Sequence, residues 1–328
     1  MMNELRGEAF DRKTIDRSFQ LMKSLNRSLI LNTIRQHQFI SRAEIAQITK
    51  LTPPTVTNIV NELLEAGLVK ESEAGKSRGG RKPILLTIEA KHSYMIGLDV
   101  GGHTVRVVLT DLNAEIEAEA KLQLPALLNP ELFLNLLTEA TKEVIAKADI
   151  PFEKLHGIGI GMHGIVNAKH GNAEFAPNFK LSHIPLKQHF EKTFSLPTVI
   201  ENDARALALG EKWFGNGQGF ENLVCVNVGI GIGAGIILNN ELFHGRDGIA
   251  GEIGHTIVDL NGKQCTCGNY GCLQTVAGGN RLRERALESI AQGQESLIWT
   301  EANEDEALVT GELIYVAHGK ETNCQSIF

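Results

Sequence analysis

Two glycine-rich segments that repeat one pattern constrain the fold most. In residues 94–110 an apolar strand ends at Asp99, turns through Gly101 and Gly102, and returns as a second strand. Residues 223–238 repeat this strand–turn–strand pattern, with the turn glycines Gly229, Gly231 and Gly233. Such a turn can hold a phosphate on its backbone N–H groups or place Asp99 beside a metal, although glycine hairpins are common. One in each half predicts an α/β domain of two related lobes with a cleft between them.

A polar pair stands where a buried strand runs into a helix, within residues 197–210. These residues are Asn202 and Asp203. Ligands of α/β sheets bind at the C-terminal ends of strands, and a carboxylate beside an amide suits sugar hydroxyls. Facing a hydroxyl to be phosphorylated, Asp203 could act as a general base; the alternative is that it only caps the helix. Residues 155–162 are predicted to form another strand and 188–195 a helix.

Three cysteines and a histidine form the most specific motif. The residues are His255, Cys265, Cys267 and Cys272. Three thiols and an imidazole match the tetrahedral preference of zinc, and four protein ligands predict a structural site. The alternative is unligated thiols beside a core histidine. Glu252 precedes His255 by three residues, so zinc on one ring nitrogen would leave the other nitrogen and Glu252 to address a ligand.

Charge is divided unevenly along the chain. Residues 1–90 carry 14 basic and 10 acidic residues, a net of +4, whereas residues 91–328 carry 18 and 29, a net of −11. We therefore expect two domains with these bounds, the first of which contacts a polyanion. The sequence has neither a membrane-spanning apolar run nor a signal-peptide core, which predicts a cytoplasmic protein.

Helix signals in the first domain predict a helix-turn-helix. Helices are expected over residues 27–35, 42–50 and 53–66, with a separate extra helix within 1–25. Ser41 and Glu44 form a capping box, and Thr52 caps the helix that starts at Pro53. Gly67 ends that helix in a left-handed conformation.

The last of these helices is predicted to enter the major groove of DNA by its N-terminus. The candidate base and phosphate contacts are Thr52, Thr55, Thr57 and Asn58. Strands at 68–71 and 84–88 flank a glycine-rich basic tip, which predicts a wing that approaches phosphates or the minor groove. Its basic residues are Lys76, Arg78, Arg81 and Lys82. The alternative is an ordinary solvated loop.

Together these motifs resemble the ROK family (repressors, open reading frames and kinases) from about residue 20 onward. The marks are Asp99-Val-Gly-Gly, Ala176-Pro-Asn178, Glu201-Asn-Asp203-Ala, the glycines of 229–235, and the Glu252, His255 and cysteine signature. The resemblance implies an actin-like ATPase (ribonuclease H-like) fold, a structural zinc, and sugar hydroxyls held by Asn202, Asp203, Glu252 and His255. In kinase members the residue matching Asp203 is the general base.

Members with a winged helix, such as the xylose and N-acetylglucosamine repressor group, are homo-oligomers on palindromic operators. The resemblance therefore implies a homodimer or homotetramer that binds operator DNA and a small sugar.

The chain departs from the kinase pattern in four places. The first glycine turn continues with His103 where kinases carry Thr-Lys, and Ile230 replaces a threonine in the second. Gln274 replaces an acidic residue, although its amide can still bind sugar. The chain ends several tens of residues early, and residues 317–328 show no helical periodicity, typical of a frameshifted or truncated end. These departures argue against ATP as a cofactor.

Two functions remain in competition, beside a third hypothesis of a damaged chain with neither activity. The favoured hypothesis is a sugar-responsive transcriptional repressor of carbohydrate genes, with xylose and glucose as the leading sugars on family analogy. The alternative is an ATP-dependent hexose kinase that carries the DNA-binding domain incidentally, with Asp203 as its catalytic base.

Overall fold

The computed structural model describes residues 12–72, 83–125, 127–294 and 296–320. They form two compact units, one drawn from residues 1–94 with 110–116 and the other from 95–109 with 117–328. Within these described ranges, no helix has the length and apolar character needed to cross a membrane.

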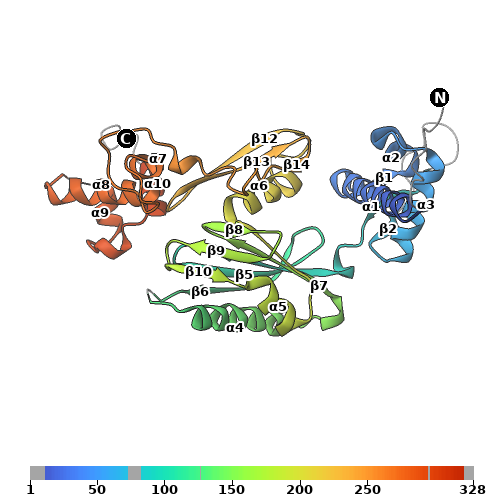
Figure 1. Cartoon of the computed structure of the whole chain (residues 1–328), viewed down its shortest axis with the longest axis horizontal. Coiled ribbons are helices and arrows are strands. Elements are labelled where there is room, and N and C mark those ends of the chain that lie inside the picture. The colour runs from blue at the N-terminus through green and yellow to red at the C-terminus, as the bar shows by residue number, and fades with distance from the viewer. Residues whose placement is uncertain (1–11, 73–82, 126, 295, 321–328) are drawn as a thin grey trace, which may run out of the picture. The chain divides into compact units, whose positions relative to one another are not determined.

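The first unit packs three helices against a small antiparallel sheet (Figure 1). Its helices are α1 (Arg12–His37), α2 (Arg42–Thr49) and α3 (Pro53–Glu65), followed by the short turn η1 (Ala90–His92). The sheet has the order β1-β3-β2, with β1 (Ile40–Ser41), β2 (Val69–Ser72) and β3 (Leu85–Ile88). Residues from all three helices and all three strands form one buried apolar core, including Ile34, Ile45, Val60 and Leu86.

Local signals place the helix boundaries of this unit. The capping box is confirmed, because Ser41 Oγ accepts from the Glu44 N–H at 3.3 Å while the Glu44 carboxylate accepts from the Ser41 N–H at 2.9 Å. Thr52 Oγ1 accepts from the Thr55 N–H at 3.4 Å, as the prediction of its cap requires. Gly67 adopts a φ of 69°, and a Cβ there would collide with the ring of His92.

One expectation for this unit was wrong, and one strand was not predicted. The helices predicted within 1–25 and over 27–35 form a single helix, α1, since neither glycine nor proline interrupts the chain between them. The strand β1 was missed because two residues are too short to show a period; Ile40 pairs with Leu86. The four basic residues predicted for the wing lie outside the described residues.

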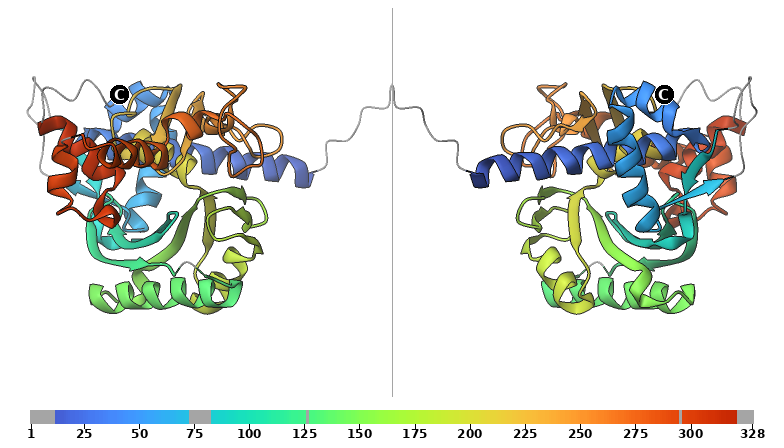
Figure 2. Two further views of the ribbon diagram at one scale, coloured as in Figure 1. Left: turned by 90° about the vertical axis from the view of Figure 1, so that its left-hand side faces the viewer. Right: turned by 90° about the vertical axis from the view of Figure 1, so that its right-hand side faces the viewer.

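The second unit begins with a five-stranded sheet of order β11-β7-β4-β5-β6. Its strands are β4 (Tyr94–Val100), β5 (Thr104–Asp111), β6 (Ile116–Gln123), β7 (Leu155–Met162) and β11 (Thr198–Asn202), with β11 and β7 parallel. Figures 1 and 2 show α4 (Pro130–Ala148) and α5 (Leu186–Phe194) along one face of it, with η2 (Phe152–Lys154) before β7. A small sheet of order β10-β9-β8 is formed by β8 (Ile165–Asn167), β9 (Asn172–Ala176) and β10 (Leu181–Ile184).

The predicted repeat is present as a second strand–turn–strand. The strands β12 (Leu223–Val228) and β13 (Ile232–Leu238) are antiparallel, and β14 (Glu241–Leu242) extends them. Helix α6 (Asp203–Phe214) contacts both β12 and β13 and also β11 and β7, so it joins the two halves of this unit. Gly235 permits this packing, because a Cβ there would lie 2.6 Å from the carbonyl oxygen of Ala204.

A loop and a group of helices complete the unit. They are η3 (Ile253–His255), α7 (Leu273–Ala277), α8 (Gly279–Ala291), α9 (Leu297–Glu301), η4 (Glu306–Leu308) and α10 (Gly311–Lys320). Buried residues such as Ala286, Ile298 and Ile314 pack α8, α9 and α10 together. The absence of helix expected from residue 317 onward was wrong for 317–320, where α10 continues; residues 321–328 lie outside the described residues.

Candidate functional site

The structure brings the histidine and three cysteines together, as the spacing predicts. One ligand atom from each of His255, Cys265, Cys267 and Cys272 lies within 4.8 Å of all the others. His255 stands in η3, Cys265 and Cys267 in the following loop, and Cys272 directly before α7. Cys265 and Cys272 are buried, and Cys267 is exposed. These four residues could hold a metal ion.

Gln274 lies next to this cluster. Its side-chain amide donates toward Cys265 Sγ at 3.2 Å, and a Cβ on Gly231 would lie 3.0 Å from its carbonyl oxygen. Gln274 therefore stands between the cysteine cluster and the second glycine turn. Its predicted contact with sugar stays a prediction.

Asn202 and Asp203 occupy the junction of β11 and α6, where the sequence places them. Asn202, not Asp203, is the helix cap: its Oδ1 accepts from the Arg205 N–H and its amide donates to the Gly164 carbonyl, both at 3.2 Å. Asp203 Oδ1 accepts from the Ala204 N–H at 2.8 Å. The buried amide of Asn202 thus has structural partners, whereas no hydrogen bond to the second carboxylate oxygen of half-buried Asp203 is found among the described residues.

The two glycine turns lie side by side. A Cβ on Gly102 would come within 2.9 Å of the Ile230 side chain and 2.5 Å of the Asn178 amide. In the first turn the Gly101 N–H donates to Thr104, and in the second the Gly229 N–H donates to Gly231, both at 2.9 Å. The sequence repeat therefore brings the predicted phosphate loops together.

Three carboxylates share the electrostatic field of this region. Desolvation raises the pKa of Asp99, and the charge of Asp203 adds to that rise while Arg106 opposes it. Burial likewise raises the pKa of Glu252, which positive charge on His255 and Arg205 opposes and Asp203 increases. Asp203 is thus close enough to influence acidic groups from β4 and from the loop before η3.

Sequence reasoning missed His163, which follows β7 in the same region. Its ring is 7% exposed, and its Nε2 has no hydrogen-bond partner among the described residues. Nδ1 lies 3.1 Å from the Val100 carbonyl, and the ring packs edge-on against Phe179. Burial lowers the pKa of His163, which favours the neutral form of the ring. No motif marked it, because the contacts that bury it come from distant parts of the chain.

The four DNA-binding residues predicted from the helix-turn-helix gather at the start of α3 in the first unit. Thr52, Thr57 and Asn58 are exposed, and Thr55 is half-buried. The hydroxyls of Thr52 and Thr55 lie 2.8 Å apart, and Thr57 donates to the Pro53 carbonyl at 2.9 Å. Asn58 therefore presents the least engaged polar group of the four.

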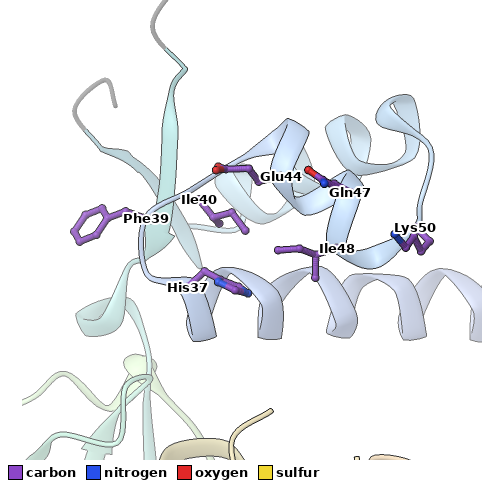
Figure 3. A pocket seen from close by; sticks show the side chains of 7 residues that line it. All are labelled: His37, Phe39, Ile40, Glu44, Gln47, Ile48 and Lys50. Carbon is purple, nitrogen blue, oxygen red and sulfur yellow. The ribbon is translucent and has the colours of Figure 1, made fainter. Parts of the chain in front are cut away.

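The first unit also has a shallow pocket of about 470 Å³ that the sequence did not predict (Figure 3). It is lined by His37, Phe39, Ile40, Glu44, Gln47, Ile48 and Lys50. Figure 3 shows these side chains at the end of α1, on β1 and along α2. Glu44 is already engaged in the capping box, and the remaining polar residues of the lining are His37, Gln47 and Lys50.

Residues 95–319 match the ROK family, and residues 24–70 match the winged helix-turn-helix DNA-binding family. The chain belongs to the ROK family. Its relatives include the xylose repressor of Caldicellulosiruptor bescii, 37% identical over 87% of this chain and 72% of the relative. The DNA-binding transcriptional dual regulator NagC of Escherichia coli is 35% identical over 85% of this chain and 68% of its own length.

Two solved structures of ROK proteins are also similar to this chain. A ROK family transcriptional regulator, a homologue of the E. coli MLC protein, has a TM-score of 0.72 at 30% identity and covers 91% of this chain and 74% of its own. A ROK glucokinase from Streptomyces griseus, in complex with glucose and AMPPNP, has a TM-score of 0.62 at 31% identity, covering 70% and 72%. The chain spans about two thirds of the length of the curated relatives that it matches, from 66% to 72% among the first four.

Proposed function

We propose that the chain is a sugar-responsive DNA-binding repressor of carbohydrate genes. The observation that carries this proposal is a capped helix-turn-helix joined in one chain to a ROK domain. The relatives named as xylose repressor and as DNA-binding transcriptional dual regulator NagC support it, because their similarity extends over 87% and 85% of this chain.

For the DNA side we propose that α3 enters the major groove. Asn58 and Thr57 would contact bases, Thr52 and Thr55 phosphates, and the basic residues at 76, 78, 81 and 82 the backbone or minor groove. A homodimer or homotetramer would place two such helices on the half-sites of a palindromic operator.

For the effector side we propose a small sugar, xylose or glucose. Asp203 and Glu252 would accept hydrogen bonds from its hydroxyls, and His255, Asn202 and Gln274 would complete the set. A sugar changes DNA binding only if it binds two conformations of the protein with different affinity. The amide of Asn202 would have to exchange its present partners to reach the sugar.

For the metal we propose zinc in a structural role. A tetrahedral site with Zn–S near 2.3 Å and Zn–N near 2.0 Å separates two sulfurs by about 3.8 Å and sulfur from nitrogen by about 3.5 Å. Cys267 Sγ lies 3.7 Å from Cys272 Sγ, and Cys265 Sγ lies 3.5 Å from His255 Nδ1. These two separations suit a bound zinc, which would fix His255 with its Nε2 toward Glu252.

A gel-shift titration on palindromes from sugar operons tests the repressor. We expect a complex that one sugar weakens and that rising salt also weakens, because phosphate contacts release counterions. No shift on any such palindrome beyond that on random duplex would contradict the proposal.

A sugar kinase is the second candidate, favoured by the adjacent glycine turns and by Asp203 at the strand end. A coupled ADP-release assay with glucose, mannose, N-acetylglucosamine and xylose separates the two functions. Zero turnover by protein that retains its zinc would exclude the kinase function.

A further inference from the structure

A buried arginine links the two parts of the proposed sugar site. Arg205 lies in the first turn of α6, and its side chain is 2% exposed. Its Nε donates to Glu201 Oε1 at 2.8 Å, and its guanidinium donates to the carbonyl oxygen of Gly248 at 2.6 Å. The side chain thus connects the end of β11 to a loop 43 residues later in the chain.

The carboxylate of Glu201 is held by further groups. Its Oε1 also accepts from the backbone N–H of Asn202 at 2.8 Å, and its Oε2 lies 2.7 Å from His244 Nε2. His244 and Gly248 belong to the same loop, so Glu201 and Arg205 each hold one point of it. A buried ion pair with both partners engaged in this way fixes geometry more than it stabilises the fold.

The loop of residues 244–251 leads directly to Glu252. The Ala250 N–H donates to the His244 carbonyl at 3.1 Å, and the Ala234 N–H of β13 donates to the Gly251 carbonyl at 2.8 Å. Gly251 has a φ of 92°, a conformation that favours glycine. The loop is therefore fixed to β13 at one end and to Arg205 in its middle, and Glu252 follows it without a free linker.

We infer that Arg205 is a positioning residue that sets the place of Glu252 and His255 relative to Asn202 and Asp203. This inference rests on the proposed sugar site. A ligand gripped from both sides binds tightly only when both sides are held in place before it arrives. In the described part of the chain, the side chain of Arg205 forms no hydrogen bond with either group of sugar ligands and acts through Glu201 and the loop. Only its backbone N–H contacts a proposed ligand, because it donates to Asn202 Oδ1.

The test compares Arg205→Met with Arg205→Lys in the full chain. Both replacements are unbranched and long, so they conserve most of the apolar stem, but only lysine keeps a cationic donor. Arg283→Met is the matched control, because Arg283 also donates to two backbone carbonyls, of Val309 and Glu306, both at 2.8 Å.

Sugar affinity is measured calorimetrically with D-xylose and D-glucose. We expect Arg205→Met to bind the sugar about tenfold more weakly, because the free energy of one charged hydrogen bond corresponds to about that factor in affinity. Arg205→Lys should recover part of the lost affinity. Arg283→Met should bind as the wild type does. Equal affinity for the methionine, lysine and wild-type proteins would mean that Arg205 only fills space, and the inference would be wrong.

Hydrogen exchange without sugar tests the link separately from the proposed function. We expect amides of residues 244–251 to exchange about tenfold faster in Arg205→Met, with no change there in Arg283→Met. Unchanged exchange would overturn the inference even if sugar binds. If the wild type binds neither sugar, the proposal of xylose or glucose as effector is wrong. Hydrogen exchange still tests whether Arg205 holds the loop of residues 244–251 in place. Glu201→Gln, an isosteric change, provides the same exchange test should Arg205→Met not fold.

Discussion

His255 Nδ1 lies 3.5 Å from Cys265 Sγ, while its Nε2 lies 3.9 Å from a carboxylate oxygen of Glu252. One imidazole thus faces the cysteine cluster with one nitrogen and a proposed sugar ligand with the other. Metal binding at Nδ1 would fix the orientation in which Nε2 is presented, so loss of the metal should weaken sugar binding.

Replacing Cys267 by serine tests this dependence. We expect metal content to fall from about one zinc per chain to near zero, because the proposed site has no protein ligand to spare. Sugar binding should be lost with it, since His255 is no longer fixed. Metal analysis of purified protein and calorimetry with sugar measure the two effects.

Cys225→Ser is the control for that experiment. Cys225 lies in β12 and is not part of the cluster. Its replacement should therefore leave both zinc content and sugar affinity unchanged. Full zinc content in Cys267→Ser would show that the zinc is held elsewhere.

Asn58→Ala tests the proposed reading of DNA by α3. Loss of a bidentate base contact costs about 1–3 kcal/mol, so affinity for the operator should fall about 5- to 150-fold. Affinity for random duplex should not change, because that binding depends on phosphate contacts. Fluorescence anisotropy on both duplexes measures the two affinities. Asn113→Ala changes an exposed asparagine in the same unit and should have no effect on either.

Ser41→Ala tests the capping box before α2. Removal of the hydroxyl should destabilise the helix by about 0.5–2 kcal/mol, because the Glu44 N–H loses its acceptor. Amides of α2 should then exchange about 2- to 30-fold faster with solvent. Ser24→Ala, at an exposed site within α1, should cause no such loss; equal protection of α2 in both variants would refute the role of the cap.

Short-range chemistry made much of the fold predictable. Two helix starts are predicted by contacts within three residues, one by Ser41 with Glu44 and the other by Thr52 with Pro53. The cysteine cluster was predictable for a related reason, since its four ligands fall within 18 residues of sequence and metal geometry restricts their spacing.

Long-range contacts could not be read from the sequence. Arg205 meets Gly248 across 43 residues, and His163 meets Val100 across 63. Neither partner carries a side-chain pattern that identifies the other, because both are backbone carbonyls. The role of Asn202 as a cap was ambiguous for another reason: asparagine and aspartate are equally good caps, and only the backbone decides which of two neighbours occupies that position.

The last prediction concerns pH and His163. Burial lowers the pKa of this ring below its ordinary 6.5, with the nearby charge of His103 acting in the same direction and Asp203 and the Val100 carbonyl opposing it. The unfolded chain therefore binds a proton more readily than the folded protein. Stability from His163 is fully present above 6.5 and falls as the pH drops from that value toward the folded pKa.

His163→Asn should abolish this dependence, because its amide can still donate to the Val100 carbonyl but does not titrate. Urea unfolding at about pH 7.5 and about pH 5.5 gives the change in unfolding free energy for each protein; only the difference between them is assigned to His163. Metal release on acidification affects both proteins alike and cancels in that difference. We expect the wild type to lose more stability than the variant. An equal loss of unfolding free energy in both proteins would contradict the prediction. It would mean that protonation of the His163 ring does not destabilise the fold, because Nε2 gains a partner when it is protonated.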